Sequence, residues 1–206
     1  MARKTNNDDD IQVVSIRNCR LSLPSLWEPT ASIEGGKEKY RADLIIDPDS
    51  KDGKKACDDI EDAIAFLEDE VFGREMKFKA GRLCYGEGND RENADGDIYT
   101  GYEDMMYISA SRDKPPKVDD LQGNPLRERD GVIYGGCRVH AVVRLYAIND
   151  KKKGGAGIFA DLLAVIFYDD DEPFGQSIDI DKYTEGLYEG KRDDDDDDDD
   201  DRGSRR

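Results

Sequence analysis

The feature that most constrains the fold is a pair of strand-like stretches near the end of the chain. The stretches GCRVHAVVRLYAI (residues 136–148) and GIFADLLAVIFY (residues 157–168) are separated by NDKKKGGA, a short connection rich in turn residues. Two such stretches with so short a connection predict an antiparallel hairpin. In the first stretch every second residue from Cys137 to Ala147 is apolar, so one side of this strand is expected to face a core.

Other strand signals precede the hairpin. Stretches of β type at residues 11–23, 39–47, 76–85 and 104–111 alternate with loops rich in Gly, Asn, Asp and Pro. One amphipathic helix is expected at about residues 54–72, where apolar residues recur at helical spacing. We therefore predict a mainly β fold, an OB-fold-like five-stranded barrel with one inserted amphipathic helix. A β-sandwich is the alternative.

The charge is distributed unevenly along the chain. The net charge is −18, and residues 193–206 contribute −6 of it through nine aspartates and three arginines, which leaves −12 for residues 1–192. A run of aspartates cannot form a core. We therefore expect a disordered acidic C-terminal tail at 191–206, a flexible N-terminus at 1–10 and one domain at 11–190.

The remaining composition argues against metal sites and membrane spans. The four cysteines, at positions 19, 57, 84 and 137, are too far apart for a zinc knuckle or a redox pair, and His140 is the single histidine. We expect reduced, partly buried thiols, no metal and no cofactor. No apolar stretch reaches about 18 residues and the N-terminus has no signal-like segment, so the expected location is the cytoplasm.

Catalytic motifs are also missing from the sequence. It contains no GxxxxGK[ST], HExxH, GxSxG or GxGxxG in a strand–helix setting. Asp49, Asp52 and Lys54 follow one another in an order typical of metal-dependent nucleases, but they lie in one loop, whereas such sites take their ligands from separate strands. We expect no catalysis.

Basic residues and tyrosines occupy the positions that strand alternation places outside the core. In four expected strands, the side opposite the apolar residues carries Lys, Arg or Tyr, while the acids concentrate in the helix, loops and tail. This pattern suits single-stranded nucleic acid, because cations meet phosphates and rings stack on unpaired bases. A half-solvated sheet of any function would show it too. The candidate DNA-binding residues are Lys39, Arg41, Lys77, Lys79, Tyr99, Tyr102, Tyr107, Arg112, Arg138, Arg144, Tyr146 and Lys152.

Three segments resemble a family of phage single-stranded DNA-binding proteins that is distantly similar to the T7-type single-stranded DNA-binding protein. They are SLPSLWEPTASIEGGKEKYRADLIIDPDSK (22–51), TGYEDMMYISASRDKPPKVDD (100–120) and IYGGCRVHAVVRLYAINDKKKGGAGIFADLLAVIFYDDDEPFG (133–175). The resemblance implies an OB-fold, no catalytic activity and a role in phage replication or recombination in the host cytoplasm. The oligomeric state, monomer or homodimer, is left open.

The resemblance also bears on the tail, because acidic C-terminal tails are common in such proteins. The nine aspartates from Asp193 to Asp201 are expected to compete with DNA and to recruit replication proteins such as a polymerase or helicase. Such tails commonly end in an apolar or aromatic residue, whereas this chain ends in RGSRR. The alternative function is an acidic protein-interaction module or DNA mimic that binds a basic partner, which the charge of −12 on residues 1–192 favours.

Overall fold

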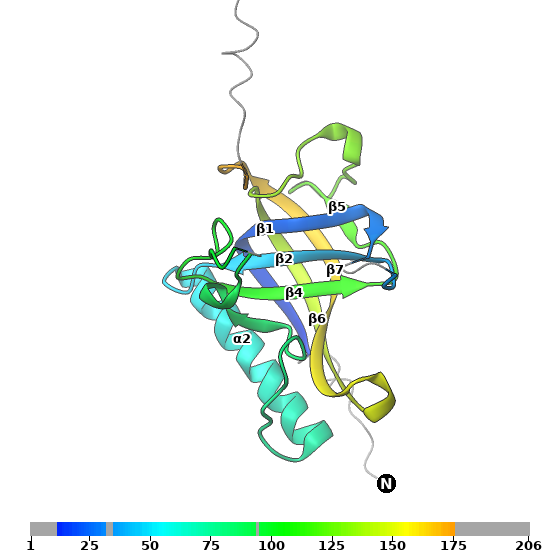
Figure 1. Cartoon of the computed structure of the whole chain (residues 1–206). Helices are drawn as coiled ribbons and strands as arrows, with labels where there is room; N and C mark the ends of the chain where they lie inside the picture. The colour runs from blue at the N-terminus through cyan, green and yellow to red at the C-terminus, as the bar shows by residue number, and fades with distance from the viewer. Residues whose placement is uncertain (1–11, 32–34, 94, 176–206) are drawn as a thin grey trace, which may run out of the picture. The chain divides into compact units, whose positions relative to one another are not determined.

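The predicted hairpin is present in the computed structural model, which describes residues 12–31, 35–93 and 95–175. Its two strands, β6 and β7, pair in antiparallel register from end to end, and they extend beyond the other strands at the lower right of Figure 1. The elements are β1 (Val13–Thr30), β2 (Lys39–Ile46), α2 (Lys51–Leu67), η1 (Glu68–Phe72), β3 (Tyr85–Glu87), η2 (Gly88–Asp90), β4 (Met106–Arg112), β5 (Lys117–Asp119), η3 (Glu128–Asp130), β6 (Arg138–Asp150), η4 (Lys151–Lys153) and β7 (Gly155–Asp169).

Five of these strands close into a barrel. β1 pairs with both β2 and β6, and β2 pairs with β4, all in antiparallel orientation. A parallel contact between β4 and β7, at Ala110 and Ala160, joins the two ends of the sheet. The short strands β3 and β5 add to β4 and β7. Closure of the ring confirms the predicted OB-fold-like barrel and excludes the β-sandwich, which would leave two separate sheets.

β1 can serve two neighbours because it bends twice. Its first part pairs with β6 and its later part with β2, and shifts in register occur around Asn18 and Leu23. Both residues adopt the left-handed backbone region, with φ of +50° and +47°. Bulges of this kind bend a strand and increase its twist, which is what a small closed barrel requires.

The single predicted helix is confirmed, with an earlier start. α2 begins at Lys51 instead of residue 54, because the side chain of Ser50 accepts a hydrogen bond from the backbone N–H of Gly53 (3.0 Å) and so caps the first turn. One turn of π-helix, η1, continues α2 to Phe72, and Gly73 ends it in the left-handed conformation (φ +67°). The helix therefore ends where the sequence predicted.

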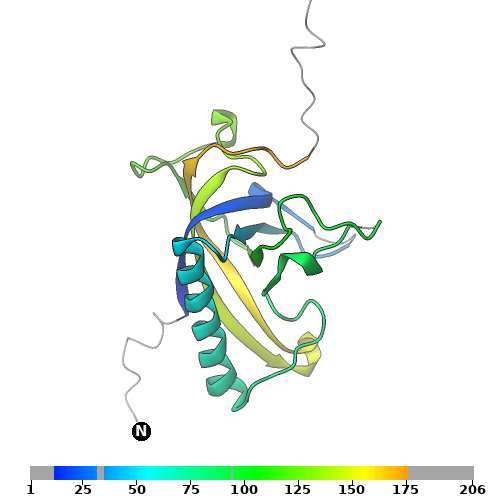
Figure 2. The ribbon, with the colours of Figure 1, turned by 90° about the vertical axis from the view of Figure 1, so that its left-hand side faces the viewer.

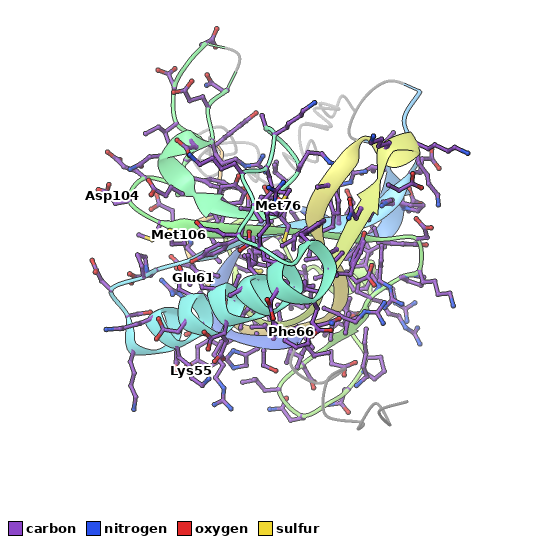
Figure 3. All side chains as sticks on the ribbon, turned by 90° about the horizontal axis from the view of Figure 1, so that it is seen from below. Lys55, Glu61, Phe66, Met76, Asp104 and Met106 are labelled. Atoms are coloured by element: carbon purple, nitrogen blue, oxygen red, sulfur yellow. The ribbon has the colours of Figure 1, made fainter. Side chains whose placement is uncertain are left out.

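α2 packs mainly against β1 and lies alongside the barrel, as Figures 2 and 3 show from two directions. The side toward the barrel is the predicted apolar stripe, of which Ala56, Ile60, Ala63 and Leu67 are buried. Val71, at the end of the same stripe, is 40% exposed because it lies in the π-helical turn beyond the barrel-facing part. The acidic side of the helix therefore faces away from the barrel.

The strand alternation predicted for β6 is confirmed by burial. Cys137, Val139, Ala141, Val143 and Leu145 are each no more than 1% exposed and form part of one apolar core. All four cysteines are free and buried. Burial raises the pKa of the Cys19 and Cys84 thiols to about 12, so these thiols remain protonated at neutral pH.

The predicted strand in the first part of the stretch 76–85 is wrong. Residues 75–79 form no strand, and within this stretch only Tyr85 enters one, as the first residue of β3. Phe78 still packs against the core and meets Phe72 edge-on, with ring centroids 5.8 Å apart. Residues 75–79 join no strand, whereas the end of the stretch does pair: Leu83 forms an isolated parallel bridge with Ile158 of β7, and Tyr85 begins β3.

The predicted N-terminal segment 1–10 and acidic tail 191–206 lie outside the described residues, as does the expected domain end at 190. Within the described part of the chain, no helix is long and apolar enough to cross a membrane.

Candidate functional site

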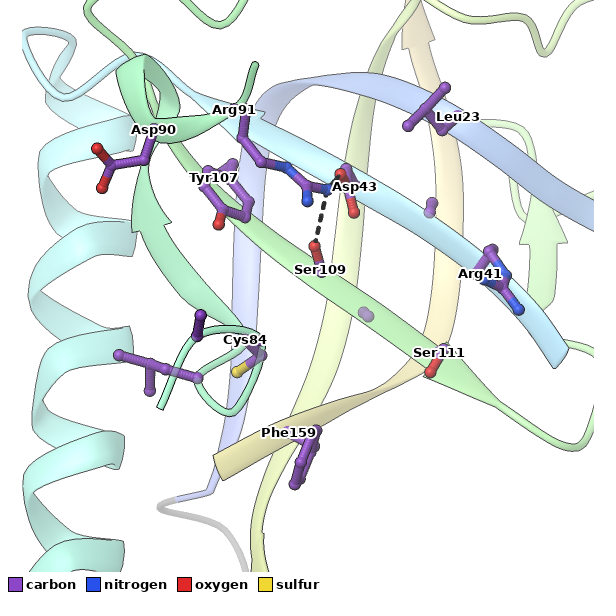
Figure 4. A pocket seen from close by; sticks show the side chains of 15 residues that line it. Leu23, Arg41, Asp43, Cys84, Asp90, Arg91, Tyr107, Ser109, Ser111 and Phe159 are labelled. Atoms are coloured by element: carbon purple, nitrogen blue, oxygen red, sulfur yellow. Dashed lines mark hydrogen bonds and ion pairs between the residues drawn. The ribbon is translucent and has the colours of Figure 1, made fainter. Parts of the chain in front are cut away.

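A groove of about 740 Å³ opens on the outer surface of the barrel over β2 and β4. Figure 4 shows these two strands as its floor, with Arg91 and Asp90 above them and Phe159 of β7 below. The lining residues are Leu23, Arg41, Ala42, Asp43, Ala80, Gly81, Leu83, Cys84, Asp90, Arg91, Tyr107, Ser109, Ala110, Ser111 and Phe159.

The floor follows from the register of the two strands. Arg41 is paired with Ser111 and Asp43 with Ser109, so these four side chains share the outer face of neighbouring strands. Tyr107 continues the same row on β4, two residues before Ser109. The residues between them alternate into the core, so β2 and β4 present a polar and aromatic surface to the groove.

Asp43 is buried in this floor, with only 7% of its surface exposed. Its Oδ2 accepts hydrogen bonds from the guanidinium of Arg91 and from the hydroxyl of Tyr102 (2.9 Å). Both donors belong to the segment between β3 and β4, which crosses the floor. Burial, followed by the charge of Asp43, raises the pKa of Tyr102, so this hydroxyl remains a donor. The two donors explain how a carboxylate is tolerated there.

Arg91 lies over the ring of Tyr107, with its guanidinium carbon 4.6 Å from the ring centroid. Its Nη2 also contacts Ser109 Oγ at 3.4 Å, the dashed line in Figure 4. Burial opposes the charge of Arg91, but the Asp43 carboxylate outweighs burial and raises the pKa of the guanidinium. Among the described residues, the buried Nε atoms of Arg91 and Arg41 have no acceptor.

The other end of the groove is aromatic. The guanidinium of Arg82 lies over the ring of Phe159 (4.7 Å), and Tyr146 contacts the same ring with centroids 5.9 Å apart. Gly157 makes this arrangement possible, since a Cβ at this position would lie 2.8 Å from the Phe159 ring and 2.9 Å from the carbonyl oxygen of Arg82. Stacked arginine and aromatic side chains therefore occur at both ends of the groove.

Leu23 lies at the rim of the groove where β1 bends. It is 59% exposed and has a left-handed backbone, which is strained for a residue other than glycine. An exposed apolar side chain on a strained backbone is often found at a functional site. Figure 4 shows Leu23 facing the groove from the side opposite Phe159, so it adds an apolar contact surface.

Several predicted site residues come together at this groove. Arg41 and Tyr107 line it, and Lys39 lies on the same side of β2 as Arg41. Tyr146 reaches the groove end through its contact with Phe159. Tyr99 is 43% exposed in the segment between β3 and β4. Their roles in DNA binding remain predictions.

Two predicted residues have a different environment from the one expected. Tyr102 is 1% exposed and its hydroxyl is bonded to Asp43, so its ring offers no open surface for a base. Arg112 pairs with Tyr40 and lies on the side of β4 that carries the buried Ala110. Tyr102 is thus a structural support of the groove, and Arg112 faces away from it.

Two of the predicted DNA-binding arginines, Arg138 and Arg144, are paired with acids and do not line the groove. Arg138 forms an ion pair with Asp171 (2.7 Å) and lies at the opposite end of β6 from Tyr146. Arg144 pairs with Asp161 (2.6 Å) on the neighbouring β7. The physical reason is that a barrel curves, so outward positions on different strands face different directions, and alternation alone does not tell them apart.

The three remaining predicted lysines are exposed outside the groove floor. Lys77 and Lys79 belong to the irregular segment that leads to Ala80 and Gly81 at the groove edge. Lys152 lies in η4, the turn of the hairpin. In the part of the chain that the structure describes, the lysine ion pairs are formed by Lys37, Lys55 and Lys117 and by none of these three residues.

Sequence reasoning missed several residues of the groove, among them Asp43, Arg91 and Phe159, and it also missed Arg82, which stacks on Phe159. Arg91 lies in a loop rich in Gly, Asn and Asp, where neither strand alternation nor helical spacing of apolar residues predicts the direction of a side chain. Asp43 offered one signal, since it is an acid on the side of a strand that otherwise carries Lys39 and Arg41. Its burial depends on a segment that follows it by about fifty residues, which alternation does not predict.

Comparison with known proteins gives consistent results. A family model described as the single-stranded DNA-binding protein of Enterobacter phage Enc34 matches residues 12–199. The structure titled single-stranded DNA-binding protein from bacteriophage Enc34 in complex with ssDNA is 29% identical, with a TM-score of 0.67, and the match covers 80% of this chain and 90% of that one.

Two further proteins match this chain, one by sequence and one by structure. Putative protein p50 of Acyrthosiphon pisum secondary endosymbiont phage 1 is 31% identical over 169 residues, which cover 78% of this chain and 85% of the relative. The single-stranded DNA-binding protein gp2.5 of bacteriophage T7 is 16% identical with a TM-score of 0.47, a likeness too weak to argue from. The match of the family model over most of the chain decides the family. This chain belongs to the Enc34 family of phage single-stranded DNA-binding proteins.

Proposed function

We propose that this protein binds single-stranded DNA, largely without regard to sequence, in the groove over β2 and β4. The observation that carries this proposal is the row of Arg41, Arg91 and Tyr107 on one outer face of the barrel, with Phe159 at its end. Guanidinium groups bind phosphates, and exposed rings stack on unpaired bases of any sequence. The solved Enc34 relative in complex with ssDNA supports the same ligand class.

The proposed role is non-catalytic and belongs to phage replication or recombination in the host cytoplasm, with the protein as a monomer or homodimer. The direct test is fluorescence anisotropy with labelled oligo(dT) and with a duplex of matched length. We expect saturable binding of oligo(dT) that weakens as salt is raised. Absence of oligo(dT) binding at about 50 mM salt would contradict the proposal and favour the acidic interaction module, which the charge of −12 on residues 1–192 also suits.

The acidic tail is proposed to compete with DNA for this groove. A segment of 14 residues, the length of 193–206, has a contour length of roughly 45 Å. A polyanion tethered to the protein would occupy cationic positions until DNA displaces it. The displaced aspartates, from Asp193 to Asp201, would then be free to bind basic surfaces of a polymerase or helicase.

Deleting residues 193–206 is therefore expected to tighten oligo(dT) binding, by roughly ten-fold at about 50 mM salt and by less than about two-fold at 300 mM, because salt screens the competing charges. The control replaces all nine aspartates by asparagine, which keeps the length and removes the charge, and it should match the deletion. Unchanged affinity of both variants at low salt would remove the competition while leaving DNA binding intact.

A further inference from the structure

The groove contains two arginines with different electrostatic surroundings. Arg91 forms an ion pair with Asp43, and the two side chains are 33% and 10% exposed. Arg41 donates to the carbonyl oxygen of Thr30, and within the described residues no carboxylate lies within 4 Å of its guanidinium. The charge of Arg91 is therefore offset by the carboxylate of Asp43. The charge of Arg41 is not offset by any acid of the described residues.

The geometry of Arg91 is that of a stacking group. Its guanidinium lies over Tyr107 at 4.6 Å and is also 5.9 Å from the ring centroid of Tyr102. Its Nη2 donates to Asp43 Oδ2 and to Ser109 Oγ, two residues of the groove floor. A planar, weakly hydrated cation on an aromatic ring extends the flat surface on which a nucleobase can stack.

We propose that Arg91 binds a nucleobase by stacking, that Asp43 is the residue that positions it, and that Arg41 binds a phosphate. This assignment rests on the proposed function and divides the groove into a base-binding part at Tyr107 and a phosphate-binding part at Arg41. It also accounts for a buried carboxylate in a groove that binds a polyanion, since Asp43 holds the guanidinium over Tyr107 and offsets its charge.

The salt dependence of binding separates the two roles. Each phosphate neutralised by the protein releases counterions and adds about 0.7 to the slope of log K against log salt for a single strand. A guanidinium that is already neutralised by Asp43 adds little to this slope, although its loss weakens binding at every salt concentration. The loss of a phosphate contact instead weakens binding mainly at low salt.

The experiment measures oligo(dT) affinity from about 50 to about 400 mM salt for matched variants. The double variant D43N/R91Q removes both charges of the pair and keeps the net charge of the protein. We expect it to bind about ten-fold more weakly at every salt concentration, with the slope changed by less than about 0.2. R41Q should flatten the slope by about 0.7. K55Q/D59N removes an exposed ion pair of α2 in the same way and should change neither quantity.

Two single variants test the roles of Arg91 and Asp43 separately. R91K keeps the ion pair but loses the planar group, so affinity should fall several-fold at all salt concentrations, whereas lysine would be an adequate phosphate contact. D43N leaves Arg91 charged and unpaired, so the slope should steepen by up to about 0.7 while affinity at high salt falls. Thermal unfolding of each variant shows whether it is folded at the assay temperature.

The outcomes are distinct. A flatter slope for D43N/R91Q, equal to that of R41Q, would overturn the assignment and make Arg91 a phosphate contact. Full affinity of R91K would contradict stacking. Failure of the unmodified protein to bind oligo(dT) would instead remove the proposed function, and the assignment with it.

Discussion

Replacing Tyr107 by alanine is expected to weaken oligo(dT) binding by roughly 5- to 150-fold, because one stacked base contributes roughly 1–3 kcal/mol by truncation. Tyr107 is half-buried on the groove floor and carries Arg91 on its ring, so its loss removes both a stacking surface and the support of the guanidinium. The loss should persist at high salt, where phosphate contacts are screened. Fluorescence anisotropy at about 50 mM and about 400 mM salt measures it.

The matched control is Tyr168→Ala. Tyr168 is 40% exposed on β7 and its ring contacts His140 at 4.5 Å, and it does not line the groove. This variant should bind as the unmodified protein does. Equal losses for Tyr107→Ala and Tyr168→Ala would mean that DNA follows another surface, and a loss for Tyr107→Ala that disappears at high salt would argue against stacking.

The second large effect is expected at the adjacent position, on stability instead of binding. Ile108 alternates to the inside of β4 and is fully buried, between Leu44 of β2 and Tyr85 of β3 in the register. Ile108→Ala should lower the free energy of unfolding by about 3 kcal/mol, since truncating a buried isoleucine to alanine leaves a cavity and typically costs about 2–5 kcal/mol. Urea unfolding followed by circular dichroism measures it.

Tyr107→Ala serves as the comparison for this prediction. Because Tyr107 faces the groove, its truncation should change the free energy of unfolding by about 1 kcal/mol or less. Ile108→Ala should still bind oligo(dT) normally where it is folded. A small stability change for Ile108→Ala, or a loss of binding in its folded state, would contradict the division of β4 into a core side and a ligand side.

The location of the acids makes a groove for a polyanion possible in an acidic protein. The acids of α2 lie on the side that faces away from the barrel, and Asp171 and Asp161 are engaged by Arg138 and Arg144. Of the two acids that line the groove, Asp43 is buried and paired with Arg91, whereas Asp90 is exposed at the edge of the floor. Local pairing therefore counts for more than the net charge, because interactions beyond about 8–10 Å are screened at physiological salt.

The sequence alone predicted much of the barrel. The apolar side of residues 137–145, the hairpin turn and the stripe of α2 all follow from side-chain periodicity, which is local and is fixed by backbone geometry. The irregular segment at residues 75–79 was predicted as a strand because its alternation is genuine, but a strand also needs a partner edge. Pairing is a property of the whole sheet, so this prediction failed.

Side-chain periodicity predicted the buried side of β2, β4 and β6 and the end of the helix, and three segments of the sequence indicated the family. Which outward residues meet depends on how the barrel closes. Arg41 and Tyr107 line one groove, while Arg138 lies elsewhere in an ion pair. Side-chain alternation separates inward from outward positions only, whereas the outward positions of a closed barrel face many directions. The burial of Asp43 beneath Arg91 and Tyr102 likewise depends on contacts between residues that are far apart in the sequence.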